Sequence, residues 1–180
     1  MDPRHNQLLA ALPEDEWLRW LPLLEPVTLR YGQVLFESGD TPTSVMFPTT
    51  AVASLSYMTR DGGSAEFAVV GNEGLVGISL FLGGNATPSR ALVQSAGQGY
   101  RLAASGFKTL VERGGTALQL LLRYTQSLIV QTAQTAACNR HHTIDQQFCR
   151  RLLMGLDRAQ SDELAMTHEA IANLLGVRRE

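Results

Sequence analysis

The chain has 180 residues, which is room for one domain and part of a second, and is long enough to bury a core without disulfides or metals. Hydrophobic residues make up 44% and charged residues 18%, a composition that excludes a disordered chain. The formal net charge of −2 excludes a global basic field of the kind that attracts nucleic acid, although residues 111–180 carry eight basic against seven acidic side chains.

The sequence has the features of a cytoplasmic protein. Its two cysteines, Cys138 and Cys149, cannot make a disulfide framework, and we interpret them as buried thiols. The N-terminus MDPRHNQLLA carries charges and a proline where a secretory signal needs an apolar segment. No run approaches the roughly 20 apolar residues of a membrane helix. We therefore expect a cytoplasmic localisation and no membrane partner.

The first predicted element is a helix that starts near Pro13 and reaches about Leu24. Acidic residues 14–16 fall in its first turn, where carboxylates favour the positive end of the helix dipole. Its apolar side chains then recur on one face, at the spacing i, i+3, i+4 and i+7, namely at Trp17, Trp20, Leu21 and Leu24. This pattern predicts a small helix that covers a core.

Residues 27–103 predict a series of short strands. The runs are rich in β-branched and aromatic residues, and turn signals such as Asp61-Gly62-Gly63 separate them. The predicted strands are 27–29, 33–36, 45–47, 52–58, 64–70, 91–95 and 99–102. Strands at this spacing favour a sandwich or barrel.

A long helix is predicted over 116–141, within a helical zone that begins near Gly106. Its first half is apolar nearly all round, so it must be covered on two sides. The β-domain can cover one side, and a second copy of the helix can cover the other. We define the helix seam as Leu121, Tyr124, Leu128, Gln131, Thr135 and Cys138, which repeat at the spacing of a dimer contact. Packing within one chain is the alternative.

A further helix is predicted over 144–156, followed by a polar loop over 157–163 and the segment MTHEAIANLLGVRRE. In that segment Thr167 is a good N-cap, and Gly176 ends the apolar face of the helix. A second helix beginning at Val177 would place Arg178, Arg179 and Glu180 on the first turn, which enters the major groove in a helix-turn-helix. An ordinary amphipathic helix with a glycine C-cap and a charged tail is the alternative.

MTHEAIANLLGVRRE resembles the Crp/Fnr family of bacterial transcription regulators, in which a Thr-capped helix, an Ala…Gly turn and an Arg-Glu pair open the recognition helix. The order of parts is also similar: a β-roll of the cyclic-nucleotide-binding type, a long dimerisation helix and a winged helix-turn-helix. The resemblance implies that Thr167, Arg178, Arg179 and Glu180 serve DNA binding, with Arg179 and Glu180 reading bases. The segment stops at Glu180, one turn into the second helix, so we expect these 180 residues to bind DNA weakly or not at all.

The resemblance also implies an effector site in the roll, built from a Gly-rich turn and an Arg. The matching residues are Gly74, Leu75, Val76, Gly77, Ile78, Ser89, Arg90 and Ala91. Ile78 stands where cyclic-nucleotide binders have a Glu for the ribose, and Glu73 stands at their first glycine, so we expect no tight binding of a cyclic nucleotide. Arg90 is then either an anion ligand or a structural ion-pair partner of Glu73 or Glu66.

Catalytic and metal sites find little support in the sequence. A metal cupin needs His and Glu ligands on its strands, and no histidine lies between residues 27 and 103. Cys138 and Cys149 would stand ~16 Å apart on a continuous helix, too far to share one zinc. No nucleophile elbow or phosphate-binding Walker loop is present. We therefore expect no enzyme, no metal and no identified cofactor.

The predicted fold class is α+β, an N-terminal antiparallel β-roll with flanking helices, a long dimerisation helix and a truncated C-terminal helix-turn-helix. The predicted domains are a cyclic-nucleotide-binding-like sensor over 1–110, the dimerisation helix over 111–142, and the first part of a DNA-binding domain over 143–180. The predicted function is a homodimeric DNA-binding transcription regulator that senses a small effector. The alternative is a ligand-binding or scaffolding roll whose terminal helix does not read DNA.

Overall fold

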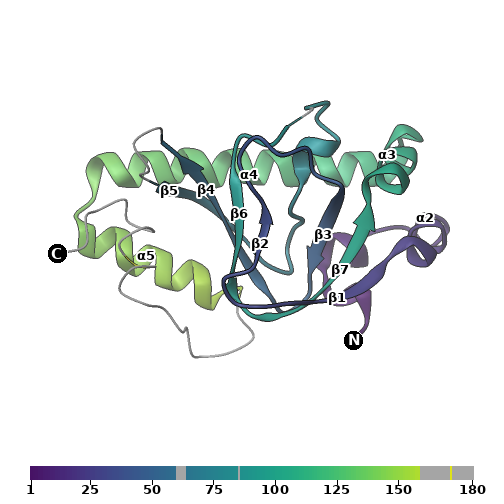
Figure 1. Ribbon diagram of the computed structural model, residues 1–180, viewed down its shortest axis with the longest axis horizontal. Coiled ribbons are helices and arrows are strands. Elements are labelled where there is room, and N and C mark those ends of the chain that lie inside the picture. The colour runs from purple at the N-terminus through teal and green to yellow at the C-terminus, as the bar shows by residue number, and fades with distance from the viewer. Residues whose placement is uncertain (60–63, 85, 159–170, 172–180) are drawn as a thin grey trace.

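The structure is a computed structural model that describes residues 1–59, 64–84, 86–158 and 171. A β-roll lies in the middle, and the long helix α4 (Gly115–His141) runs along one side of it (Figure 1). The N-terminal helices and α3 (Ala104–Glu112) lie at one end of the roll, and α5 (Ile144–Leu156) lies at the other. Within the described ranges, no helix combines the length and the hydropathy that crossing a membrane requires.

The roll consists of two antiparallel sheets whose strands match the predicted runs to within two residues at each end. One sheet has the order β1-β7-β3, and the other has the order β2-β6-β4-β5. The strands are β1 (Glu25–Leu29), β2 (Val34–Phe36), β3 (Ser44–Pro48), β4 (Val52–Met58), β5 (Ser64–Val70), β6 (Arg90–Ser95) and β7 (Gly97–Ala103). The predicted β-roll with flanking helices is therefore confirmed.

The N-terminal segment forms η1 (Pro3–His5), α1 (Gln7–Ala10), α2 (Glu14–Trp20) and η2 (Leu21–Leu23). The helix predicted to reach Leu24 ends at Trp20, because the chain tightens into a 3₁₀ turn at Pro22, whose nitrogen cannot donate a helical hydrogen bond. Trp17 and Trp20 are buried as predicted, whereas Leu21 is 41% exposed. Trp20 packs edge-on against Phe47 and Phe107, with ring centroids 6.1 and 6.0 Å apart.

Two glycines with positive φ mark the start of α4: Gly114 at 73°, just before the helix, and Gly115 at 75°, its first residue. Gly114 has no side chain with which to cap the helix. The Glu16 carboxylate from α2 does so instead, since both its oxygens accept a hydrogen bond at 3.0 Å, from the amides of Thr116 and Ala117. A negative group at a helix N-terminus also complements the helix dipole.

The helix seam faces the roll and α5 of its own chain, so its assignment to a dimer contact was wrong. Leu121, Tyr124, Thr135 and Cys138 are buried within the chain. Gln131 exchanges hydrogen bonds with Val69 on β5, accepting from the amide at 2.7 Å and donating to the carbonyl at 3.3 Å. Because β5 is an edge strand, this side chain satisfies backbone groups that the sheet leaves unpaired. The intramolecular alternative was correct for this face.

Helix α5 starts with a capping box, in which the Thr143 hydroxyl accepts from the Gln146 amide and the Gln146 side chain accepts from the Thr143 amide. The helix is fixed to the roll by Arg151, whose guanidinium donates to the Glu66 carboxylate at 2.5 Å and to the Glu66 carbonyl at 2.6 Å. Both side chains of this ion pair are about 5% exposed or less. Cys138 is buried as predicted, but Cys149 is exposed on α5.

The buried pair predicts a pH dependence of stability. Burial raises the pKa of Glu66 from 4.5 to about 7, against the attraction of Arg151. The folded chain therefore holds this proton more tightly than the unfolded chain does. The free energy of unfolding should fall as the pH rises from about 4.5 to 7, by at most about 1.4 kcal/mol per pH unit, and then level off. Urea denaturation at several pH values measures it.

In Glu66→Gln the decline over this pH window should be smaller, whereas Glu112→Gln, at an exposed position, should keep it. A wild-type chain whose unfolding free energy rises from pH 5 to pH 7, relative to Glu66→Gln, would mean that the Arg151 charge outweighs the cost of burial.

Candidate functional site

A cavity of about 510 Å³ lies between the roll and α4. Its walls come from all four strands of the four-stranded sheet, from the segment around η3 (Ile78–Leu80), from the chain leading into β6, and from the middle of α4. The lining residues are Phe36, Leu55, Phe67, Val76, Gly77, Ile78, Ser79, Leu82, Thr87, Pro88, Ser89, Ala91, Thr125, Leu128, Ile129, Thr132 and Ala133. The volume is typical of a site for a small molecule.

The turn that precedes η3 brings the backbone close to β3, and this requires a glycine at position 77. Gly77 has φ of +104°, a conformation that side chains disfavour. A Cβ atom there would also lie 3.1 Å from the Ser44 carbonyl oxygen. One residue earlier, Val76 pairs with Met46 through two backbone hydrogen bonds of 2.8 and 2.9 Å. The predicted role of Gly77 as a turn glycine therefore has a clear geometric reason.

The eight residues predicted to bind an effector divide into three groups. Five of them line the cavity: Val76, Gly77, Ile78, Ser89 and Ala91. Gly74 and Leu75 lie instead against Tyr124 of α4. Arg90 lies on the opposite side of the strand from Ser89 and Ala91, because successive side chains of an extended chain alternate between faces.

Arg90 pairs with Glu37, with the two nearest charged atoms 3.3 Å apart. The expected ion pair with Glu73 or Glu66 is therefore corrected, and these carboxylates bind Arg158 and Arg151 instead. Arg90 lines a separate groove of about 150 Å³ on the outer face of the four-stranded sheet. The pairing register places Phe36 of β2 opposite Ala91 of β6. Glu37, the residue after β2, therefore lies close to Arg90, the first residue of β6.

The prediction from sequence missed the wall that α4 contributes, which is Thr125, Leu128, Ile129, Thr132 and Ala133. The change from an apolar to a small, polar composition along this helix was visible in the sequence, but it does not say which face meets the roll. The hydroxyls of Thr125 and Thr132 donate to backbone carbonyls one turn earlier in the helix, both at 2.8 Å.

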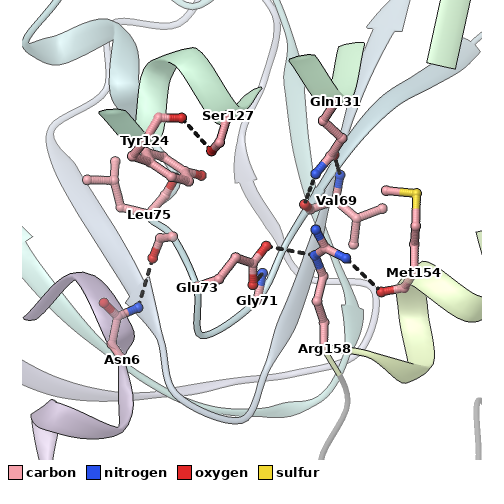
Figure 2. A network of polar contacts seen from close by, with 11 residues as sticks. Asn6, Val69, Gly71, Glu73, Leu75, Tyr124, Ser127, Gln131, Met154 and Arg158 are labelled. Atoms are coloured by element: carbon pink, nitrogen blue, oxygen red, sulfur yellow. Dashed lines mark hydrogen bonds and ion pairs between the residues drawn. The ribbon is translucent and has the colours of Figure 1, made fainter. Parts of the chain in front are cut away.

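The turn over 71–75 connects the roll to the N-terminus, to α4 and to α5 (Figure 2). Tyr124 donates its hydroxyl to the Leu75 carbonyl at 2.8 Å, and burial raises the pKa of this phenol, so it remains a donor. The neighbouring Gly74 carbonyl accepts from the amide of Asn6 at 2.8 Å. Glu73 accepts from the Gly71 amide at 3.0 Å and from Arg158 at 2.7 Å.

The predicted DNA-binding residues Thr167, Arg178, Arg179 and Glu180 lie outside the described residues. Across residues 1–59, 64–84 and 86–158, no three side chains of His, Cys, Asp or Glu come together in a group that could hold a metal ion.

Comparisons with known proteins give the fold but no close relative. No protein-family model matches the sequence. No curated protein matches it either. Among solved structures, a transcriptional regulator of the Crp/Fnr family from Eubacterium rectale has a TM-score of 0.78 at 13% identity, and the match covers 97% of this chain and 82% of that chain.

Two further structures are similar over most of their length. FixK2 from Bradyrhizobium japonicum has a TM-score of 0.72 at 13% identity, covering 86% of this chain and 78% of that chain. The c-di-GMP responsive global regulator CLP from Xanthomonas campestris has a TM-score of 0.71 at 14% identity, and the match covers 92% of this chain and 86% of that chain. The chain therefore has a Crp/Fnr-like fold, as the resemblance implied.

The contact between Gly74 and Tyr124 generates a prediction of stability. A Cβ atom on Gly74 would overlap the Tyr124 ring, so Gly74→Ala must displace the ring, or α4 with it, from the turn. We expect it to lower the free energy of unfolding by about 1–3 kcal/mol, the usual cost of overpacking. Tyr124→Phe should cost about 1 kcal/mol, because it leaves the buried Leu75 carbonyl without its donor. Urea denaturation gives both values.

Gly106→Ala is the matched control. Gly106 lies within α3, and a Cβ atom there would meet its nearest neighbour, the end of the Leu23 side chain, at 3.4 Å. Alanine is the better helix former, so this variant should be neutral or slightly more stable. Equal effects of Gly74→Ala and Gly106→Ala would contradict the close approach of α4 to the turn.

Proposed function

We propose that the chain acts as a homodimeric, DNA-binding transcription regulator that senses a small effector through its β-roll, by binding and not by catalysis. The observation that carries the proposal is the cavity between the roll and α4, in a chain with a Crp/Fnr-like fold. A ligand in this position touches the sensor roll and the helix that would contact a second copy. One binding event can then alter the arrangement of two subunits.

The proposed dimer contact is an exposed apolar stripe on α4 that borders the cavity. Leu122, Ile129 and Val130 are 51%, 63% and 61% exposed there, and Ala133 continues the stripe one turn later. The stripe spans residues 122–133 of the 27-residue helix, and the same stripe of a second copy can cover it, as a two-fold contact requires. Ile129 also lines the cavity, so it connects the effector site directly with this face.

DNA binding is proposed from the terminal segment MTHEAIANLLGVRRE. Thr167 would cap the first helix of a helix-turn-helix, and Arg178, Arg179 and Glu180 would lie on the first turn of the reading helix. Arginine can donate two hydrogen bonds to guanine, and glutamate can accept from cytosine. Two copies related by a two-fold axis would read the two halves of a symmetric site.

The dimer contact is tested by Leu122→Glu combined with Ile129→Glu, which would place two pairs of like charges in an apolar contact. We expect the wild-type chain at tens of micromolar to scatter light as a dimer, and the double variant to be a folded monomer with an unchanged circular-dichroism spectrum. Lys108→Glu, at an exposed position on α3 and outside the stripe, should remain a dimer. A monomeric wild type would contradict the proposed contact.

DNA reading is tested in a chain that continues through a complete helix-turn-helix. Footprinting should reveal a two-fold symmetric site, with half-sites about one helical turn or a multiple of it apart. Arg179→Ala and Glu180→Ala should each cost about 1–3 kcal/mol and relax the choice of base at one position in each half-site. Losses that are uniform across all operator variants would mean that both residues touch only phosphate.

A further inference from the structure

The walls of the cavity contain no charged side chain among the described residues. All seventeen lining residues are apolar, small or hydroxyl-bearing. Moving an ionised group from water into such surroundings is very unfavourable unless an opposite charge meets it there. The walls therefore select against a phosphate or carboxylate.

The two charged residues beside the predicted effector segments, Arg90 and Glu73, do not line the cavity, and both are already paired. Arg90 stands between two lining residues, Ser89 and Ala91, but it lies on the other face and pairs with Glu37. Glu73, on the turn before Gly77, is held by Arg158. A nucleotide phosphate in the cavity would therefore meet neither Arg90 nor Arg158.

Hydroxyl groups supply the polarity that the cavity has. Thr87 and Ser89 lie side by side, with their oxygen atoms 3.3 Å apart, so this pair already has a partner. Ser79 differs, because its hydroxyl oxygen is buried and has no hydrogen-bond partner among the described residues. A buried polar group without a partner costs stability, and a ligand that supplies the missing partner recovers it.

We infer that the effector is an uncharged, largely apolar small molecule whose hydrogen-bonding group meets the Ser79 hydroxyl, and that it carries no phosphate. This inference rests on the proposed function, since it takes the cavity to be the effector site. The volume of about 510 Å³ suits a molecule of one or two rings.

The test uses two probes of one shape, 1-naphthol and 1-naphthyl phosphate, together with cyclic AMP. Calorimetric titration of the 180-residue chain should show 1-naphthol binding, and 1-naphthyl phosphate and cyclic AMP binding at least 10-fold more weakly. Ser79→Ala should weaken 1-naphthol about 3- to 10-fold, since it removes one hydrogen bond. It should not lower the melting temperature of the free chain, because the hydroxyl has no partner to lose.

Two variants locate the probe, and one is a control. Thr132→Trp fills the cavity from α4, and Ser89→Trp fills it from the roll, so either variant that retains the wild-type fold should abolish 1-naphthol binding. Arg90→Ala should leave 1-naphthol binding unchanged, because Arg90 lies outside the cavity.

Three results would overturn the inference: no 1-naphthol binding up to millimolar concentration, binding that survives in a folded cavity-filling variant, or tighter binding of 1-naphthyl phosphate or cyclic AMP that Arg90→Ala abolishes. The last result would leave the proposed regulator standing with an anionic effector. Conversely, a chain that binds 1-naphthol in the cavity but remains monomeric would contradict the proposed regulator and leave the ligand class standing.

Discussion

The hydrogen bond from Tyr124 to the Leu75 carbonyl fixes the distance between the long helix and the roll. It can form only because Gly74 has no side chain, so that the ring lies directly on the backbone of the turn. Asn6 holds the same turn from the opposite side and is itself completely buried. Since α4 forms one wall of the cavity, the size of the cavity depends on this contact between a phenol and a turn.

The position of α5 depends on two carboxylates, one on β5 and one on the turn that follows it. Glu66 binds Arg151 in the interior, and Glu73 binds Arg158 at the end of the helix (Figure 2 shows the second pair). A buried ion pair contributes little net stability, but breaking it by removing one partner is strongly unfavourable. These pairs therefore fix one orientation of α5 more than they strengthen the fold, and α5 is the element that leads into the terminal segment.

Local sequence signals predicted the strands well, because each run of β-branched residues is bounded by turn residues whose backbone preferences are strong. Contacts between elements far apart in the sequence were harder to predict. The partner of Arg90 is Glu37, and that choice follows from the pairing of β2 with β6, which spacing along the chain does not reveal.

The candidate site shows the same division. Gly77, Ile78 and Ser89 could be placed from the resemblance, because they belong to a turn and a strand start with a recognisable order. The wall from α4 could not, since a helix that is apolar on several faces does not disclose which face meets its own domain. For this reason the helix seam was assigned to a second copy, whereas Gln131 and its neighbours satisfy the edge of β5.

The Glu16 cap on α4 joins residues about 100 positions apart, and it has a consequence for the order of events in folding. The first turn is the costly step in forming a helix, because several residues must be fixed for a single hydrogen bond. The carboxylate that satisfies this turn belongs to a segment that leaves the ribosome long before α4 does. We therefore expect the N-terminal helices to be present as a cap when the first turn of α4 forms.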